Sequence, residues 1–299
     1  MESKYRPQVA LILDVLPEVA KESCFALHGG TAINLFVRNM PRLSVDIDLT
    51  YLPVEDRDES LRRISAGLKH IGRRIETVVP GVKVTHTEHN SKLLITRKEA
   101  VIKLEVNLTH RGTLESPKRM SLSEKVQSEF DVFCAVPIVP VGQLYGGKIC
   151  AALYRQHPRD LFDVKYLFEN EGFTNEIKTG FLLCLLGSDR PIHEAIQPKF
   201  QDQRQAMENQ FSGMTAEEFD YEDFESTRVQ LVETINNSLT KTDKEFLMSV
   251  ADGEPNWKAY DFEKFPSVRW KMLNFKILKD TNPEKHKKQL EILRTILKA

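Results

Sequence analysis

The stretch HGGTAINLFVRNMPRLSVDIDLTY, residues 28–51, joins a pair of glycines to an alternating acidic segment. Residues 23–28, which lead into it, form a short apolar run that predicts a buried strand ending at the glycine pair. Residues 31–38 carry apolar side chains at helical spacing, so a helix is expected after the glycines. A glycine turn before a helix offers backbone N–H groups at which a phosphate group can bind.

Asp46 and Asp48 are candidate metal ligands. Residues 44–50 alternate apolar and polar side chains with a period of two, which predicts a strand with both acids on one face. Two neighbouring carboxylates repel each other, and a shared cation relieves that repulsion. Because Mg²⁺ prefers hard oxygen ligands, the pair predicts a magnesium site. The alternative is an exposed edge strand whose acids are merely solvated.

Glu105 adds a third acid on a separate strand. Residues 100–109 alternate again, with apolar side chains on one face and Glu105 on the other. A strand pair that turns three carboxylates to one face predicts a two-metal platform. Gly29, Gly30 and Thr31 would form the phosphate-binding turn, through close approach of the backbone and through the threonine hydroxyl. A solvated glutamate and an ordinary tight turn are the alternatives.

The composition is that of a globular protein of about two domains. The chain has 299 residues, with 41% apolar and 28% charged side chains and a formal net charge of −1. The four cysteines lie far apart, which argues against a zinc cage or a disulfide framework. No apolar run approaches the roughly 20 residues that span a bilayer, and the first residues lack a signal-peptide core. We therefore expect a cytoplasmic protein without membrane contact.

The pattern changes near residue 140. Residues 1–140 contain the strand-like segments and predict an α/β domain, whereas residues 141–299 have an almost entirely helical pattern. Pro158 breaks the pattern between two helices, so a helical hairpin could bring Lys148 and Asp163 toward one site. Lys148 would then contact a triphosphate as a point charge, and Asp163 would orient the lysine or tune its pKa.

Two other interpretations of this hairpin were considered. Residues 142–148 match the G-x4-G-K part of a phosphate-binding loop, but Ile149 stands where a hydroxyl should bind Mg²⁺ and Tyr145 would crowd the loop. The sequence therefore argues against such a loop. The charged side chains could instead form an interhelical ion-pair network, whose members would be Arg155, Arg159, Asp160 and Asp163.

Two basic segments are candidate RNA-binding surfaces. Residues 61–75 predict a basic amphipathic helix with Arg62, Arg63, Lys69, Arg73 and Arg74. Residues 271–298 lie in a C-terminal block, 267–299, that has nine Lys and Arg against three acids. An ordinary solvated helix face is the alternative for both. Residues 213–263 have 13 acids against four basic residues, a balance that would suit a cationic small molecule such as an aminoglycoside.

The motifs resemble those of the AbiEii family of nucleotidyltransferase toxins. The first motif combines G-G-T-A, the Arg-x-Ser element at residues 42–44 and D-I-D-L within residues 28–51. The second motif is KICAALYRQHPRDLFDVKYLFE, residues 148–169, with a lysine followed by R-x3-R-D-L-F-D. The segment PSVRWKMLN, residues 266–274, is similar to the C-terminal region of the family.

The resemblance implies a fold and an activity. The fold would be α+β, with a polymerase-β-like minimal nucleotidyltransferase domain around a mixed sheet, followed by a helical C-terminal domain. The activity would be Mg²⁺-dependent (or Mn²⁺-dependent) transfer of a nucleoside monophosphate from an NTP, in some relatives to the 3′ end of tRNA. Such toxins belong to type IV toxin–antitoxin or abortive-infection modules and act beside a separate antitoxin.

The resemblance also assigns roles to residues of this chain. Metal ligands would be Asp46 and Asp48, with Glu105 as a looser match to the third acid of the wider superfamily. The catalytic set would comprise Asp46, Asp48, Glu105, Lys148 and Asp163. The nucleotide-binding set would comprise Gly29, Gly30, Thr31, Ser44 and Lys148.

Two other functions stay open at this point. The chain could be a catalytically inactive module that binds a nucleotide or blocks a partner, although all the acids of an active enzyme are present. Alternatively, an active enzyme could transfer the nucleotide to a protein or to an aminoglycoside-like small molecule. Release of pyrophosphate from NTPs would separate the first possibility from the others.

Overall fold

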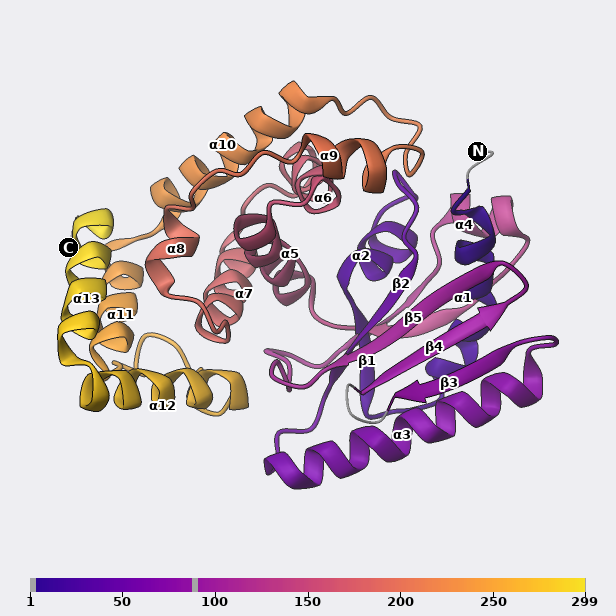
Figure 1. Ribbon diagram of the computed structural model, residues 1–299, viewed down its shortest axis with the longest axis horizontal. Helices are drawn as coiled ribbons and strands as arrows, with labels where there is room; N and C mark the ends of the chain where they lie inside the picture. Colours follow the sequence, from indigo (N-terminus) through magenta and orange to yellow (C-terminus); the bar gives the residue numbers. More distant parts are fainter. Residues whose placement is uncertain (1–3, 88–90, 299) are drawn as a thin grey trace. The chain divides into compact units, whose positions relative to one another are not determined.

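The computed structural model describes residues 4–87 and 91–298. The chain forms two compact units. Unit 1 comprises Met1–Pro140 together with Phe211–Glu218, and unit 2 comprises Val141–Gln210 with Phe219–Ala299. Unit 1 contains a mixed β-sheet and unit 2 is mostly helical (Figure 1), so the expected α+β class is confirmed.

Within the described residues, a single sheet of seven strands organises unit 1. The strands are β1 (Phe25–His28), β2 (Asp46–Tyr51), β3 (Lys83–Thr87), β4 (Lys92–Arg97), β5 (Ala100–Asn107), β6 (Lys118–Ser121) and β7 (Ala135–Ile138). Their order across the sheet is β3-β4-β5-β2-β1-β7-β6. The pairs β2–β5 and β1–β7 are parallel, and the other neighbours are antiparallel.

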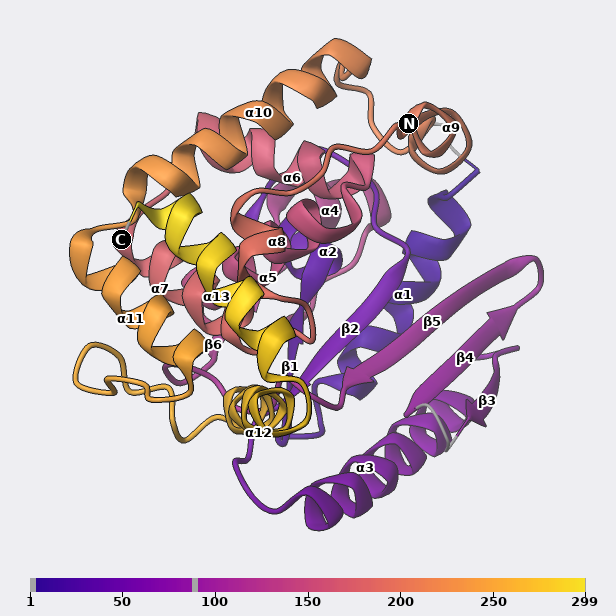
Figure 2. The same ribbon diagram turned by 60° about the vertical axis from the view of Figure 1, so that its left-hand side comes forward.

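Helices α1 and α3 pack against one face of this sheet (Figure 2). The helical segments of unit 1 are α1 (Arg6–Val19), α2 (Gly29–Ala32), the π-helix η1 (Ile33–Val37), α3 (Arg57–Val78) and α4 (Glu124–Phe130). Strand β5 alternates buried and less buried side chains, as its sequence predicts. Its buried side chains, such as Leu104, form the core with Ile47 of β2 and Ile71 of α3. The other face of the sheet therefore carries the polar side chains.

The helix expected after the glycine pair begins earlier than the sequence suggests. Gly29 and Gly30 form the first residues of α2, and the chain continues without a break into the π-helix η1. Gly29 has a φ of +74°, a backbone conformation that side chains with a Cβ rarely adopt. The glycine pair is therefore the first turn of the helix itself, with the unusual conformation at its start.

Unit 2 consists of helices and connecting loops. Its helical segments are α5 (Val141–Arg155), α6 (Pro158–Glu169), α7 (Asn175–Leu186), α8 (Ile192–Ile196), α9 (Arg204–Ala206), η3 (Met207–Phe211), α10 (Tyr221–Ser238), α11 (Lys241–Asp252), α12 (Pro266–Thr281) and α13 (Pro283–Leu297). Pro158 starts α6, where its missing N–H group is tolerated. Among the described residues, no helix is both long and apolar enough to cross a bilayer.

The glycines of α5 serve helix packing. A Cβ on Gly142 would come within 2.5 Å of the backbone carbonyl of Glu176 at the start of α7. A Cβ on Gly146 would meet the backbone of Gly180 in the same helix. Residues 142–148 are helical, which agrees with the sequence argument against a phosphate-binding loop. The glycines instead let two helix backbones approach closely.

Candidate functional site

The strand register places the three predicted acids on one face of the sheet. In the parallel pair β2–β5, Asp46 lies opposite Lys103 and Asp48 lies opposite Glu105. In the antiparallel pair β1–β2, His28 lies opposite Asp48. Side chains at directly paired positions point to the same face. The polar face of the sheet thus presents two aspartates on one strand and the glutamate on the next.

Glu105 is held by two lysines rather than by its acidic neighbours. Its carboxylate forms ion pairs with Lys92 and with Lys103, whose Nζ lies 3.0 Å away. Although burial acts in the opposite direction, the hydrogen bonds from these lysines lower the pKa of Glu105. Among the described residues, no group of three or more His, Cys, Asp and Glu side chains is placed to hold a metal ion. A metal-ligand role for Glu105 therefore stays a prediction.

Asp48 packs against the backbone of Gly29. A Cβ added to Gly29 would lie 3.2 Å from the Cβ and Cγ atoms of Asp48 and closer still to its Oδ2. The absence of a side chain at Gly29 therefore makes room for this carboxylate. Two aspartates on one strand provide the hard oxygen donors that Mg²⁺ prefers, and Mg²⁺ commonly uses one or two carboxylates plus substrate phosphates. The donor chemistry of Asp46 and Asp48 fits a magnesium ion.

A buried network connects the glycine turn to the acidic strand. The Thr31 hydroxyl donates to the backbone carbonyl of Asp46 at 2.5 Å and lies 3.0 Å from the Ser44 hydroxyl. A Cβ on Gly30 would lie 2.9 Å from the Arg42 guanidinium and 3.0 Å from Ser44 Oγ. The structure thus brings the glycines, Thr31 and Ser44 together. It also gives Thr31 a role that the sequence did not suggest, which is to hold the backbone of Asp46.

The segment 211–218 extends this network. The backbone N–H of Leu43 donates to the carbonyl of Met214 at 2.7 Å, and an isolated antiparallel bridge lies beside it. The Thr215 hydroxyl donates to the carbonyl of Pro41 at 2.9 Å. We call residues 211–218 the latch segment. It fixes the loop that leads into the acidic strand, and no local sequence signal indicated this pairing.

Two histidines of unit 1, His28 and His110, lie near each other, and the sequence reasoning gave neither of them a role in the site. His28 lies opposite Asp48, and its Nδ1 is 3.1 Å from the Thr50 hydroxyl. Burial, together with the nearby His28, lowers the pKa of His110 to about 4, so His110 is neutral at pH 7. The signal for His28 was its position directly before Gly29, at the end of a strand that runs beside the acids.

In unit 2, Lys148 is the centre of a buried ion-pair network. Its Nζ lies 2.8 Å from Asp160 Oδ1 and 2.9 Å from Asp163 Oδ2. Arg155 also contacts Asp160, with Nε 2.5 Å from Oδ2. Although burial acts in the opposite direction, Lys148 and Arg155 hold the pKa of Asp160 well below its usual range. The helical hairpin thus joins Lys148 and Asp163 in an interhelical network of the kind considered above.

The fold is that of a nucleotidyltransferase toxin. The structure is similar to MenT4, a nucleotidyltransferase toxin from Mycobacterium tuberculosis H37Rv, with a TM-score of 0.62 and 13% sequence identity. The similarity covers 89% of this chain and 92% of MenT4. At this identity it shows a shared fold. A search of curated proteins found no significant match.

The sequence identifies the family more closely. Residues 11–270 match the family described as nucleotidyl transferase AbiEii toxin, type IV toxin–antitoxin system. The chain belongs to this family of nucleotidyltransferase toxins, as the motifs suggested. Membership implies an NTP substrate and a separate antitoxin.

Proposed function

We propose that this toxin transfers a nucleoside monophosphate from an NTP to an RNA acceptor in the presence of Mg²⁺. The acceptor that we propose is the 3′ end of tRNA. The observation that carries the proposal is the pair Asp46 and Asp48 on the polar face of the sheet, with Asp48 seated against Gly29. A nucleotidyltransferase needs charge neutralisation at this point, because pyrophosphate leaves as a polyanion.

The residues around the pair have separate tasks in this proposal. Gly29 and Gly30 let the triphosphate approach the backbone, and Ser44 offers a hydroxyl beside them. Mg²⁺ held by Asp46 and Asp48 would neutralise charge on the α-phosphate and on the leaving pyrophosphate. The Thr31 hydroxyl keeps the Asp46 backbone in place through its hydrogen bond to the carbonyl.

Glu105 would receive the proton of the acceptor hydroxyl. A glutamate carboxylate is ionised at neutral pH and can therefore accept a proton, although the two lysines that lower its pKa also make it a weaker base. Its position opposite Asp48 places it on the strand next to the metal pair. Alternatively, Glu105 could help to hold a second metal ion, in which case the lysines would have to release it.

Lys148 would contact the triphosphate, and Asp163 would orient the lysine. The two carboxylates within 2.9 Å of its Nζ fix the direction of this ammonium group. Asp163 and Asp160 are both buried, so neither can swing away into solvent. A fixed ammonium group binds a phosphate without losing side-chain entropy, which favours binding.

The acidic segment 213–263 gives little support to an aminoglycoside acceptor. Several of its acids already have partners within the helical unit. Asp243 pairs with Lys178 at 2.8 Å, and Asp223 pairs with Lys165 at 3.1 Å. A cationic drug would have to displace these lysines. We therefore favour an RNA acceptor over a cationic small molecule.

The test is an incubation with each labelled NTP, first with total RNA and then with total protein. We expect Mg²⁺-dependent label in RNA of tRNA size, together with release of pyrophosphate. The Asp48→Ala variant should lose all transfer, while its free energy of unfolding stays within about 1 kcal/mol of the wild type because this residue lies on the polar face.

Each other outcome identifies a different error. Label in protein would refute the RNA acceptor but keep the nucleotidyltransferase. No pyrophosphate from any NTP, with any acceptor, would favour the inactive binding module. Full activity of Asp48→Ala would remove the proposed metal site.

A further inference from the structure

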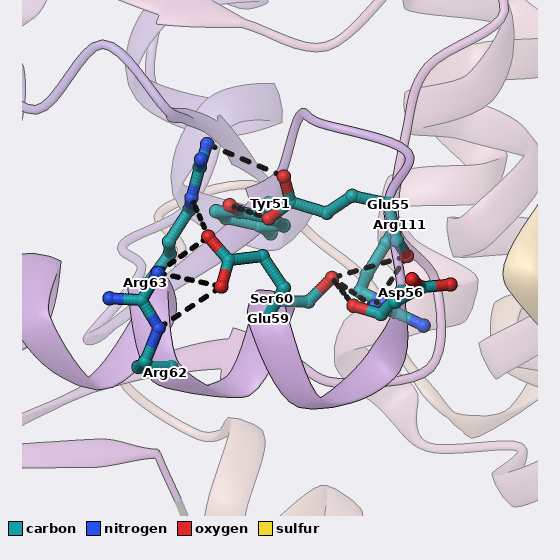
Figure 3. Close-up of polar contacts among 8 residues, drawn as sticks. All are labelled: Tyr51, Glu55, Asp56, Glu59, Ser60, Arg62, Arg63 and Arg111. Atoms are coloured by element: carbon teal, nitrogen blue, oxygen red, sulfur yellow. Dashed lines mark hydrogen bonds and ion pairs between the residues drawn. The ribbon is translucent and has the colours of Figure 1, made fainter.

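The structure distinguishes the two basic segments that the sequence offered as RNA-binding surfaces. On α3, three arginines are paired with glutamates, and Figure 3 draws two of them, Arg62 and Arg63. Arg62 lies 2.6 Å from Glu59, and Arg63 contacts both Glu59 at 2.5 Å and Glu55 at 3.3 Å. Arg74, further along the helix, pairs with another glutamate at 2.8 Å. Much of the positive charge of α3 is therefore offset by acids within the protein.

The basic side chains of the C-terminal helices are in a different state. Among the described residues, no ion pair is formed by Lys276, Lys285, Lys287 or Lys288. All four are exposed. Arg269 donates to two backbone carbonyls, which leaves its charge without a carboxylate to offset it. The net charge of +6 in residues 267–299 is thus largely available to an anionic partner.

Two basic residues of this region have partners, because Lys279 lies 3.8 Å from Asp252 and Lys271 is buried. The Lys271 side chain is buried, and its Nζ donates to the backbone carbonyl of Ser188 at 2.8 Å and to that of Arg190. It joins α12 to the loop after α7. The surface charge is therefore carried by the outer residues of α12 and by the first turns of α13.

Helix α12 also exposes an apolar stripe. The exposed fractions are 43% for Trp270, 53% for Leu273 and 49% for Ile277. Positions i, i+3 and i+7 lie on one face of a helix. Arg269 directly precedes Trp270, and the lysines lie further along α12 and at the start of α13. Exposed aromatic and cationic side chains on one surface can together bind single-stranded nucleic acid, because bases stack on the ring while phosphates contact the cations.

We infer that α12 and the start of α13 form the surface that holds the RNA acceptor, with Trp270 stacking on an unpaired base and the lysines contacting phosphates. This inference rests on the function proposed above and adds the surface to it. A second copy of the chain that docks through the same surface is disfavoured as the occupant, because two surfaces of the same positive charge repel each other. An RNA strand removes that repulsion and covers the apolar stripe.

The first experiment measures RNA binding without NTP, so that it does not depend on transfer. The probe is a fluorescent hairpin RNA with a single-stranded 3′ end, followed by anisotropy. The variant Lys287→Glu/Lys288→Glu is compared with Arg62→Glu/Arg63→Glu on α3. Both are neighbouring exposed pairs on helices and both change the net charge by the same amount, but the α3 pair is already offset by Glu55 and Glu59.

We expect the α13 variant to bind RNA at least about tenfold more weakly. The slope of log Kd against log salt concentration should also fall in magnitude by roughly one to two, because phosphate contacts are lost. The α3 variant should stay within about twofold of the wild type. Equal losses in the two variants, or a larger loss on α3, would overturn the inference. If the wild type binds this RNA but never labels any RNA, the proposed function fails while the binding surface stands.

The second experiment reads Trp270 directly. The chain has two tryptophans, so Trp257→Phe leaves Trp270 as the single reporter. We expect the hairpin RNA to quench the fluorescence of this variant and to leave the emission of Trp270→Phe, whose reporter is Trp257, nearly unchanged. Light scattering of both proteins accompanies the titration. If RNA does not quench Trp270, the stripe does not bind RNA. If the protein is a dimer that dissociates in Trp270→Ala without any loss of RNA affinity, the stripe binds a second copy of the chain instead.

Discussion

The substitution Gly29→Ala tests how the glycine pair supports the acidic strand. Gly29 has a φ of +74°, and alanine in that conformation is destabilised by about 1–2 kcal/mol. The new methyl group would also lie 3.2 Å from two carbon atoms of Asp48 and in conflict with its Oδ2. The carboxylate must therefore move, and we expect this to take it out of the position proposed for sharing a cation with Asp46.

The expected result is a loss of activity much larger than the loss of stability. A displacement of about 1 Å at a reacting centre lowers rates by about 100-fold. We expect kcat to fall by at least that factor, while urea denaturation shows a loss of about 1–2 kcal/mol in the free energy of unfolding. The assay is pyrophosphate release at saturating NTP and Mg²⁺, corrected for the folded fraction.

Gly81→Ala provides the matched control. Gly81 has a φ of +71°, and no atom lies within 4 Å of the position of an added Cβ. This variant shares the backbone strain of Gly29→Ala but leaves Asp48 untouched, so it should lose similar stability and keep full activity. Wild-type activity in Gly29→Ala, or an equal loss of activity in the two variants, would refute the role assigned to this contact.

Three further predictions concern the ion-pair network, a buried lysine and the latch segment. Lys148→Met leaves two buried carboxylates without their ammonium partner, so urea denaturation should show a loss of about 3–5 kcal/mol in the free energy of unfolding. A loss below about 1 kcal/mol would contradict a buried network. Burial lowers the pKa of Lys271 from 10.5 to about 8. Between these two pH values the unfolded chain binds more protons than the folded chain, so this residue makes the free energy of unfolding rise with pH, by about 3 kcal/mol across the window. The measurement is the difference in unfolding free energy between wild type and Lys271→Met at pH 7 and at pH 10. If that difference does not change with pH, the prediction is wrong. Thr215→Val removes the hydrogen bond to Pro41, so stability should fall by about 1 kcal/mol and the KM for NTP should rise; an unchanged KM would show that the latch segment does not position the site.

The strands around the acids were predictable because their patterns are strong. Residues 44–50 and 100–109 alternate clearly, and in the structure they overlap β2 and β5, whose parallel register sets Asp48 opposite Glu105. Strands β3 and β6 were missed. They are the two edge strands, with the sequences KVTHT and KRMS. These sequences contain few aliphatic residues, because an edge strand has a neighbouring strand on one side only.

The contacts between distant residues could not be predicted. Nothing near Glu105 indicates that Lys92 pairs with it, since that contact depends on the register of β4 against β5. The same holds for the pairing of Leu43 with Met214, which joins positions far apart in the sequence. The latter pairing arises from how the chain returns to the sheet, and the sequence alone contains no local signal for it.

The latch segment has a consequence for how the toxin is made. Its buried side chains Phe211 and Met214 belong to unit 1, although α5 to α9 of the helical unit precede them in the chain. A fragment that stops at residue 140 would lack this piece, and its loop at residues 41–43 would lose a partner strand. During translation, unit 1 cannot be completed until residue 218 has left the ribosome. A ribosome that stalls or releases the chain earlier would therefore produce a fragment whose unit 1 lacks residues 211–218.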